Sequence, residues 1–149
     1  MLFRSEKLRK SLGLENRPTI VCVGRLVHRK GQDRLVEAMP EILKRFPDAT
    51  LLFIGEGPHR AHLEALIKRN KVENSVRFIG RIQYAELPEY IALGDVFAMP
   101  SRSRFFGLEV EGLGIVYLEA SACGLPVIAG ASCGAPDAVR DGEIGRAHV

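Results

Sequence analysis

"TIVCVGRLVHRKGQDRLVEAMPEILKRFPDATLLFIG", residues 19–55, is the stretch that decides the fold. A short run of apolar and β-branched residues at 19–24 predicts a buried strand, and a similar run at 49–55 predicts a second. Between them, apolar residues at helical spacing predict a helix over 31–46, which Pro40 can kink or restart. A strand, a helix and a strand in this order indicate a right-handed βαβ unit of a parallel sheet.

The alternation of strands and helices continues along the chain. Apolar runs predict further strands at 75–80, 95–101 and 126–130. Helices are predicted to open at Pro58, to cover 85–93 and 114–124, and to begin again near Ala135–Pro136. This pattern is typical of an α/β, Rossmann-like, doubly wound parallel sheet with helices on both faces. Ligands bind such sheets at the carboxyl ends of the strands, so functional residues should directly follow the strands.

Composition narrows the class of protein. The 149 residues are 46% hydrophobic and 26% charged, as in a typical globular domain, and no apolar run is long enough to cross a bilayer. Cys22, Cys123 and Cys133 show no metal-binding spacing, which favours a reducing, cytoplasmic setting. A net charge of +3 is too small to indicate nucleic-acid binding, although it suits an anionic small ligand or a membrane surface.

The two ends of the chain look foreign to the domain. Residues 1–5 and 143–149 can be encoded as an inverted repeat of each other, and the repeat matches a common sequencing adapter. We therefore expect both ends to be artefacts, and we exclude them from fold prediction. The alternative is an ordinary start and tail, and the codons at the two ends decide between them. Residues 6–17 read as a polar helix and linker that enter a single domain over 18–142.

The segments after the first three strands suit a phosphorylated ligand. Gly24 begins a tight turn that carries Arg25 and Lys30, and a forked donor together with a point charge suits a diphosphate. The alternative is a solvated basic turn. Gly55, in "GEGP", lets backbone approach a ligand closely, or marks a simple strand-to-helix turn. Main-chain groups near Arg81–Ile82 are candidates to read a base edge.

"EGLGIVYLE", residues 111–119, places two acids around a helix start. The free N–H groups from Gly112 to Ile115 form an anion site, and a carboxylate beside it, Glu111, suits sugar hydroxyls. Glu119 lies about two turns further, on nearly the same side of the helix. The alternative is that Glu111 is only an acid at the start of the helix and that Glu119 is only an ion-pair partner. His59 and His62 lack a third ligand, so no metal site is predicted.

Together these motifs resemble a known family, the retaining glycosyltransferases of family 4, which have the GT-B fold of two Rossmann-like domains. The resemblance covers nearly all of 18–142. Glu111 and Glu119 match the family's Glu-x7-Glu signature, and "VGRLVHRKGQD" resembles its G-R-L-x-x-x-K-G segment. The stretches "GEGP", "FIGRI", "LPEYIALGDVFAMPS", "EASACGLPVIAG" and "GAPDAV" follow in the family's order. "DVFAMPSR" and "VEGLGIVYLEASACGLPVIAG" most resemble actinobacterial GDP-mannose-dependent phosphatidylinositol-monomannoside α-mannosyltransferases.

The resemblance implies a role for each matched residue. Arg25 and Lys30 would bind the donor diphosphate and stabilise the leaving group, and Glu111 would contact the donor sugar; these three are the expected catalytic residues. Glu119 would hold the ribose hydroxyls. The expected nucleotide-sugar site also includes Gly24, Gly55, Arg81, Ile82, Gly112, Leu113, Gly114 and Ile115.

The resemblance also implies a reaction and its partners. The parent protein would move a hexose, as mannose from GDP-mannose, to a lipid or glycan acceptor, with no metal cofactor. Residues 18–142 correspond to the donor-binding half, so the acceptor would be bound mainly by an N-terminal half, and this chain alone would bind nucleotide weakly without transferring sugar. We expect a cytoplasmic location, with the parent at the inner face of the plasma membrane.

The sequence differs from the family pattern at one loop, and two alternative functions remain open. The family usually has Gly-Gly in its S-G-G-x-P loop, where this chain has "SCGAP" with Cys133 at the first glycine. A donor carrying UDP instead of GDP is one alternative. A non-enzymatic α/β nucleotide- or partner-binding module is the other, although the segment after the first strand lacks the acidic cluster of a response-regulator receiver.

Overall fold

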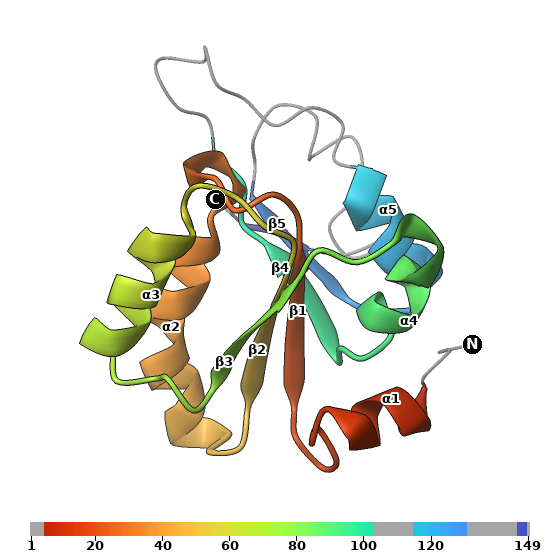
Figure 1. Ribbon diagram of the computed structural model, residues 1–149, viewed down its shortest axis with the longest axis horizontal. Helices are drawn as coiled ribbons and strands as arrows, with labels where there is room; N and C mark the ends of the chain where they lie inside the picture. The colour runs from red at the N-terminus through yellow and green to blue at the C-terminus, as the bar shows by residue number, and fades with distance from the viewer. Residues whose placement is uncertain (1–4, 103–114, 131–145, 149) are drawn as a thin grey trace.

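The computed structural model describes residues 5–102, 115–130 and 146–148, whose strands form one parallel sheet (Figure 1). The strands are β1 (Thr19–Val23), β2 (Thr50–Ile54), β3 (Val76–Gly80), β4 (Val96–Met99), β5 (Val127–Gly130) and β6 (Arg146–His148). Their order in the sheet is β3-β2-β1-β4-β5-β6, and every neighbouring pair is parallel. The predicted α/β fold with a parallel sheet is confirmed.

Helices cover both faces of this sheet. They are α1 (Glu6–Ser11), α2 (Gln32–Arg45), α3 (Arg60–Arg69), α4 (Leu87–Ile91) and α5 (Ile115–Ala122), with short 3-10 turns η1 (His28–Lys30) and η2 (Tyr84–Glu86). Figure 1 shows α2 and α3 on one side of the sheet and α4 and α5 on the other. The strand order reverses between β1 and β4, and in such sheets ligands bind at the carboxyl ends of the strands, which form the upper edge in Figure 1.

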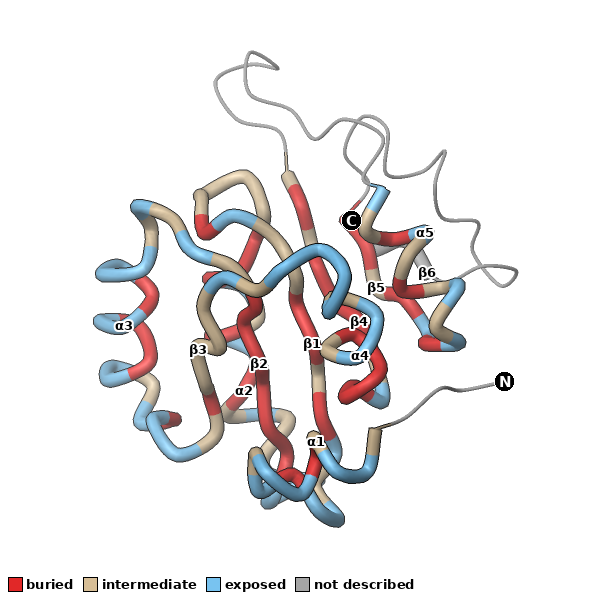
Figure 2. The backbone as a smooth tube through the Cα atoms, turned by 45° about the vertical axis from the view of Figure 1, so that its right-hand side comes forward, coloured by how far each residue is buried: buried red, intermediate tan, exposed pale blue. Residues whose placement is uncertain are grey.

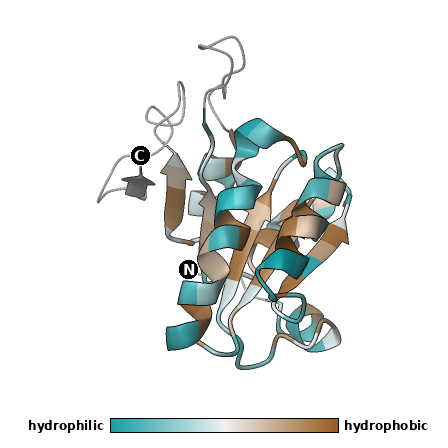
Figure 3. Ribbon diagram, turned by 90° about the vertical axis from the view of Figure 1, so that its left-hand side faces the viewer, coloured by the Kyte–Doolittle hydropathy of each residue, from teal (hydrophilic) through white to brown (hydrophobic). Residues whose placement is uncertain are grey.

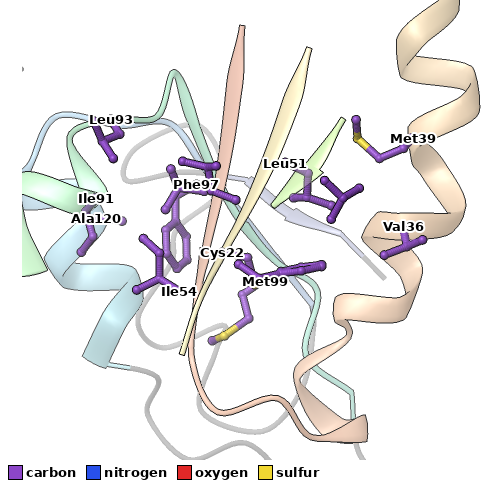
Figure 4. Packing of buried hydrophobic residues seen from close by; sticks show 14 of the residues in the cluster. Cys22, Val36, Met39, Leu51, Ile54, Ile91, Leu93, Phe97, Met99 and Ala120 are labelled. Atoms are coloured by element: carbon purple, nitrogen blue, oxygen red, sulfur yellow. The ribbon is translucent and has the colours of Figure 1, made fainter. Parts of the chain in front are cut away.

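The core lies on both faces of the central strands. All five residues of β2 are buried, and the tube in Figure 2 is largely red along β2, β1 and β4. Figure 4 shows Val36 and Met39 of α2 on one side, with Ile91 and Ala120 on the opposite side of the strands. In Figure 3 the strands are brown while the helices turn teal surfaces outward. Burial on both faces explains why the strands read as continuous apolar runs.

The helix predicted over 31–46 is confirmed as α2, which continues through Pro40. Two other helix predictions needed correction. Pro58 precedes α3 and lies before its N-cap, His59, so it does not form the first helical turn. The helix expected over 85–93 begins as η2 and continues as α4, with Pro88 in the first turn of α4. Proline lacks an N–H donor, and the first turn of a helix is where that loss costs least.

The N-terminal segment is part of the core and not only a linker. Leu14 is fully buried, and the side chain of Arg9 is buried with it. The guanidinium of Arg9 donates hydrogen bonds to the carbonyl oxygens of Leu93, Leu14 (2.6 Å) and Arg17 (3.1 Å). These bonds fasten α1 near the amino ends of the strands, away from their carboxyl ends.

Two further features complete the fold. β6 pairs with β5 inside the segment that was excluded from fold prediction, so the structure adds an edge strand there. Within the described residues, no helix combines the length and the apolar character that crossing a membrane requires.

Candidate functional site

The turns after β1 and β2 pack directly against each other at the carboxyl edge. The N–H of Leu26 donates to the carbonyl of Glu56 (3.1 Å), and the N–H of His59 donates to the carbonyl of Leu26 (2.9 Å). A Cβ atom at Gly55 would lie 2.2 Å from the carbonyl oxygen of Gly24, and the φ of Gly55 is +133°. Glycine is therefore required at position 55, because two backbones meet there.

The side chain of Lys30 lies across the end of β1. A Cβ atom at Gly24 would lie 3.7 Å from both Cδ and Cε of Lys30, so the aliphatic part of the lysine covers this glycine. Beneath it, burial raises the pKa of Cys22 to about 12, and the positive charge of Lys30 partly opposes that rise. The ammonium group is thus held near the carboxyl end of β1, where a diphosphate was predicted to bind.

A buried amide fixes the turn that carries Arg25. The carbonyl oxygen of Arg25 accepts hydrogen bonds from Nε2 of Gln32 (3.1 Å) and from the N–H of Val27 (2.9 Å). Gln32 is buried at the start of α2, while the side chain of Arg25 is exposed. Sequence reasoning missed Gln32, although a polar side chain in the first turn of a core-facing helix was a usable signal.

Three predicted site residues come together in one pocket. Arg25, Gly55 and Arg81 line a cavity of about 460 Å³, and each follows a different strand. Glu56 is the fourth lining residue, and it was not predicted. Ile82, expected to border the nucleoside, packs in part against the core, and its expected role stays a prediction. Two guanidinium groups at one cavity give the positive potential that attracts an anionic ligand, and Glu56 can accept hydrogen bonds from its polar groups.

Glu119 lies at a second pocket, on the α4–α5 side of the sheet. Its side chain is half-buried, and its Oε1 accepts a hydrogen bond of 3.0 Å from the hydroxyl of Tyr84. The structure therefore does not place Glu119 in the cavity of Arg25, and Ile115, at the start of α5, is exposed. This second pocket has a volume of about 390 Å³ and is lined by Tyr84, Leu87, Pro88, Ile91, Glu119, Ala122 and Cys123.

Helix α5 is anchored to β4 by a buried tyrosine. The hydroxyl of Tyr117 donates to the carbonyl of Met99 (2.6 Å) and lies 3.1 Å from Oγ of Ser101. The rings of Tyr117 and Phe97 meet edge to face with their centroids 6.0 Å apart. Because α5 is fixed in this way, the position of Glu119 is defined relative to the ends of the strands.

Part of the predicted site lies outside the described residues. This part includes the expected catalytic carboxylate and the glycine-rich helix start that was expected to bind phosphate. The roles assigned to them stay predictions, as does the final helix near Ala135–Pro136. The residues concerned are Glu111, Gly112, Leu113, Gly114 and Cys133.

Arg102, in the loop that follows β4, is held in an ion pair and was not among the predicted site residues. Its guanidinium binds both carboxylate oxygens of Asp33, at 2.9 and 2.8 Å, and its Nε donates to Nδ1 of His28 at 3.3 Å. Burial alone raises the pKa of Asp33, but the hydrogen bonds and charge of Arg102 hold that pKa below its ordinary value. The pair ties the loop after β4 to the start of α2.

Replacing Arg102 by glutamine is expected to destabilise the fold at neutral pH and much less in acid. The pKa of Asp33 is lower in the folded chain than in the unfolded chain. The pair therefore contributes stability that is present above about pH 4 and is lost as the pH falls through the folded-state pKa. We expect a loss of about 1–3 kcal/mol in the free energy of unfolding at pH 7.

Urea titrations of both chains, at pH 7 and near pH 3, measure this difference. Arg34→Gln is the matched control, because Arg34 pairs with Glu37 at the surface, with side chains 67% and 43% exposed. Such pairs contribute about 0–1 kcal/mol. A loss in the Arg102 variant that is equal at the two pH values would contradict the role of Asp33.

His28, which contacts Arg102, is the first of three histidines whose rings lie next to one another. The ring centroids of His59 and His62 are 4.5 Å apart, and those of His28 and His59 are 5.9 Å apart. Burial and the nearby charge of His62 lower the pKa of His59, although Asp33 acts in the opposite direction. His59 is therefore expected to be neutral at pH 7.

Comparison with known proteins identifies the family of the chain. The family model described as "Glycosyl transferases group 1" matches residues 4–148. The chain belongs to this family. The glycosyltransferase family predicted from the motifs is thus confirmed, and the carboxyl-edge residues described above belong to a glycosyltransferase domain.

The curated relatives of this chain include mannosyltransferases. It is 52% identical over 139 residues to a GDP-mannose-dependent alpha-(1-6)-phosphatidylinositol monomannoside mannosyltransferase of Mycolicibacterium smegmatis, covering 93% of this chain and 36% of that protein. A protein of the same name from Mycobacterium tuberculosis matches with the same identity and coverage. The chain therefore spans about a third of the length of these relatives, and the predicted likeness to this subgroup is confirmed.

Solved glycosyltransferase structures match the fold. Anabaena Alr3699/HepE, in complex with UDP and glucose, has a TM-score of 0.81 and 29% identity over 98% of this chain and 39% of its own. The C-terminal domain of the group 1 family protein LpcC from Francisella tularensis has a TM-score of 0.77 and 28% identity over 99% of this chain and 76% of its own. The chain thus has the architecture of a glycosyltransferase C-terminal domain.

Proposed function

We propose that this chain is the donor-binding half of a retaining glycosyltransferase that moves mannose from GDP-mannose to a phosphatidylinositol-type lipid or glycan acceptor. The observation that carries the proposal is the pocket in which Arg25, Gly55 and Arg81 meet from three strand ends. The 52% identity to GDP-mannose-dependent relatives supports the choice of donor. The parent would work at the inner face of the plasma membrane, where a lipid acceptor is available.

The proposed reaction needs positive charge where the donor bond breaks. As the bond from the sugar to the diphosphate lengthens, negative charge develops on the departing phosphate oxygens. Arg25 and Lys30 would stabilise this charge, since both belong to the turn after β1 and the lysine covers Gly24. Fixed cations aimed at developing charge lower the barrier to a reaction. In this proposal the two cations take the place of a divalent metal.

The carboxylates would orient the donor. Glu119 is proposed to accept hydrogen bonds from the ribose hydroxyls, and Glu111 from the sugar hydroxyls. Because Arg25 and Glu119 line separate pockets, a nucleotide would have to extend between the β1–β3 loops and α5. Gly112 to Ile115 would then supply main-chain donors to the sugar and the β-phosphate, as a helix start does for anions.

Titration of the purified chain with GDP and with UDP tests this proposal. We expect weak, saturable binding of GDP, weaker binding of UDP, and no transfer of sugar by the chain alone. A domain that uses UDP-sugars, as the HepE complexes would suggest by analogy, reverses the order of the two nucleotides. A module unrelated to nucleotide sugars binds neither, and that result would contradict the proposed function.

A further inference from the structure

An exposed tyrosine reaches across the α4–α5 pocket to the carboxylate of Glu119. Tyr84 belongs to η2, which follows β3, and its hydroxyl donates to Oε1 of Glu119 on α5 at 3.0 Å. The tyrosine is 78% exposed, so core packing does not explain its placement. What the structure shows instead is a hydrogen bond between residues 35 positions apart, joining the loop after β3 to α5.

The turn that presents Tyr84 is itself held in place. The N–H of Gln83 donates to Oε2 of Glu86 (3.4 Å), and the N–H of Glu86 donates to the carbonyl of Gln83 (3.0 Å). Leu87, the next residue, packs in part against the core. These contacts fix η2 at both ends, so the phenol is presented by an ordered turn two residues after Ile82.

The backbone of Glu119, the acceptor of this hydrogen bond, is also held in place, but its side chain is less constrained. Helix α5 is anchored through Tyr117, as described above, whereas the side chain of Glu119 has three rotatable bonds and lies half-buried at the pocket. A glutamate of this kind loses rotamer entropy when it binds a ligand. A hydrogen bond that holds the carboxylate beforehand reduces that loss, which is the general advantage of preorganised sites.

The carboxylate of Glu119 can accept hydrogen bonds from a ligand as well as from Tyr84. An ionised carboxylate offers two oxygens and about four acceptor positions, so one phenol hydrogen bond leaves positions for a vicinal diol. The hydrogen bond to Glu119, together with its negative charge, raises the pKa of Tyr84, so the phenol keeps its proton at neutral pH. Tyr84 can therefore act as a permanent donor to the carboxylate.

We propose that Tyr84 is a positioning residue whose hydroxyl holds the Glu119 carboxylate in the orientation that accepts the ribose diol of the donor nucleotide. This inference rests on the proposed function, because it takes Glu119 as the ribose-binding acid. It adds a residue whose side chain touches neither phosphate nor sugar in the proposal and acts through its neighbour.

The test distinguishes a loss of contacts with the ribose diol from a general loss of nucleotide binding. The 149-residue chain and its Tyr84→Phe variant are titrated with GDP and with 2′,3′-dideoxy-GDP, which lacks the diol. We expect Tyr84→Phe to weaken GDP binding about 3- to 10-fold, the effect of one hydrogen bond, and to leave dideoxy-GDP binding unchanged. Glu119→Gln should show the same selectivity, and the double variant should bind GDP no worse than Glu119→Gln alone.

Tyr90→Phe is the matched control, because Tyr90 lies on α4 and packs against the core without a role in the proposed site. It should leave the binding of both nucleotides unchanged, and circular dichroism checks that each variant is folded. Equal losses for GDP and dideoxy-GDP in Tyr84→Phe, or no loss for either, would overturn the role of Tyr84 while leaving the proposed function intact. Failure of the unaltered chain to bind GDP or UDP would overturn both.

Discussion

Replacing Lys30 by alanine in the full-length enzyme lowers the rate of sugar transfer by about 100-fold or more. The reason is the position of the ammonium group, whose side chain is held over Gly24 at the carboxyl end of β1. A charge-assisted hydrogen bond contributes about 1.5–3 kcal/mol, whereas a helix N-terminus contributes about 0.3–1 kcal/mol, rising to about 2 where it is partly buried. The lysine should therefore outweigh the helix start as a stabiliser of the departing diphosphate.

Initial rates of mannosyl transfer by the parent protein measure this effect. Lys30→Arg should recover part of the rate, because it restores the charge with a different shape. Lys68→Ala is the control, since Lys68 is an exposed lysine at the end of α3, far along the chain from the basic turn. A Lys30→Ala enzyme with near-normal turnover would refute the role in stabilising the leaving group.

Replacing Gly31 by alanine severely destabilises the chain. Gly31 has a φ of +75°, and a Cβ atom there would lie 2.1 Å from the carbonyl oxygen of Pro100. The left-handed backbone costs a non-glycine residue about 1–2 kcal/mol, and overpacking adds about 1–3 kcal/mol. Because the obstacle is a backbone carbonyl, the loops after β1 and β4 would have to separate. We expect a total loss of about 2–5 kcal/mol in the free energy of unfolding.

Gly13 provides a closely matched comparison for this prediction. Its φ of +66° is similar, but nothing lies within 4 Å of the Cβ atom that alanine would add. Gly13→Ala should therefore show the backbone cost alone, about 1–2 kcal/mol. Urea unfolding of the two variants side by side measures the difference. If both variants lose the same stability, the close approach of Gly31 and Pro100 is not a constraint on this fold.

The strands could be predicted from the sequence because a strand that is buried on both faces consists almost entirely of apolar residues. The run at 49–55 is apolar throughout, and β2 is buried at every position. Helix starts were harder to predict where proline was present, since Pro58 and Pro88 each lie at a position that local rules alone do not fix. The same rules gave no account of Arg9, whose partners are carbonyl groups distant in sequence or in neighbouring turns.

The candidate site also contains residues that could be predicted from local sequence and contacts that could not. Arg25, Gly55 and Arg81 could be found because each directly follows a predicted strand, and parallel strands bring their carboxyl ends together. The contacts of Arg102 with Asp33, and of Tyr84 with Glu119, join segments 69 and 35 residues apart. No spacing rule links such residues, because the partner of a polar side chain depends on packing that only the folded chain defines.

The central claim is that this domain holds the nucleoside diphosphate of a sugar donor at the pocket of Arg25 and Arg81. Isothermal titration of the 149-residue chain with GDP tests it most directly, with Arg25→Ala, Arg81→Ala and the remote Arg45→Ala titrated alongside. We predict saturable binding of one GDP per chain, weakened in the first two variants and unchanged in the third. A folded chain that binds no GDP or UDP, or that binds GDP equally well without Arg25 and Arg81, would contradict the claim.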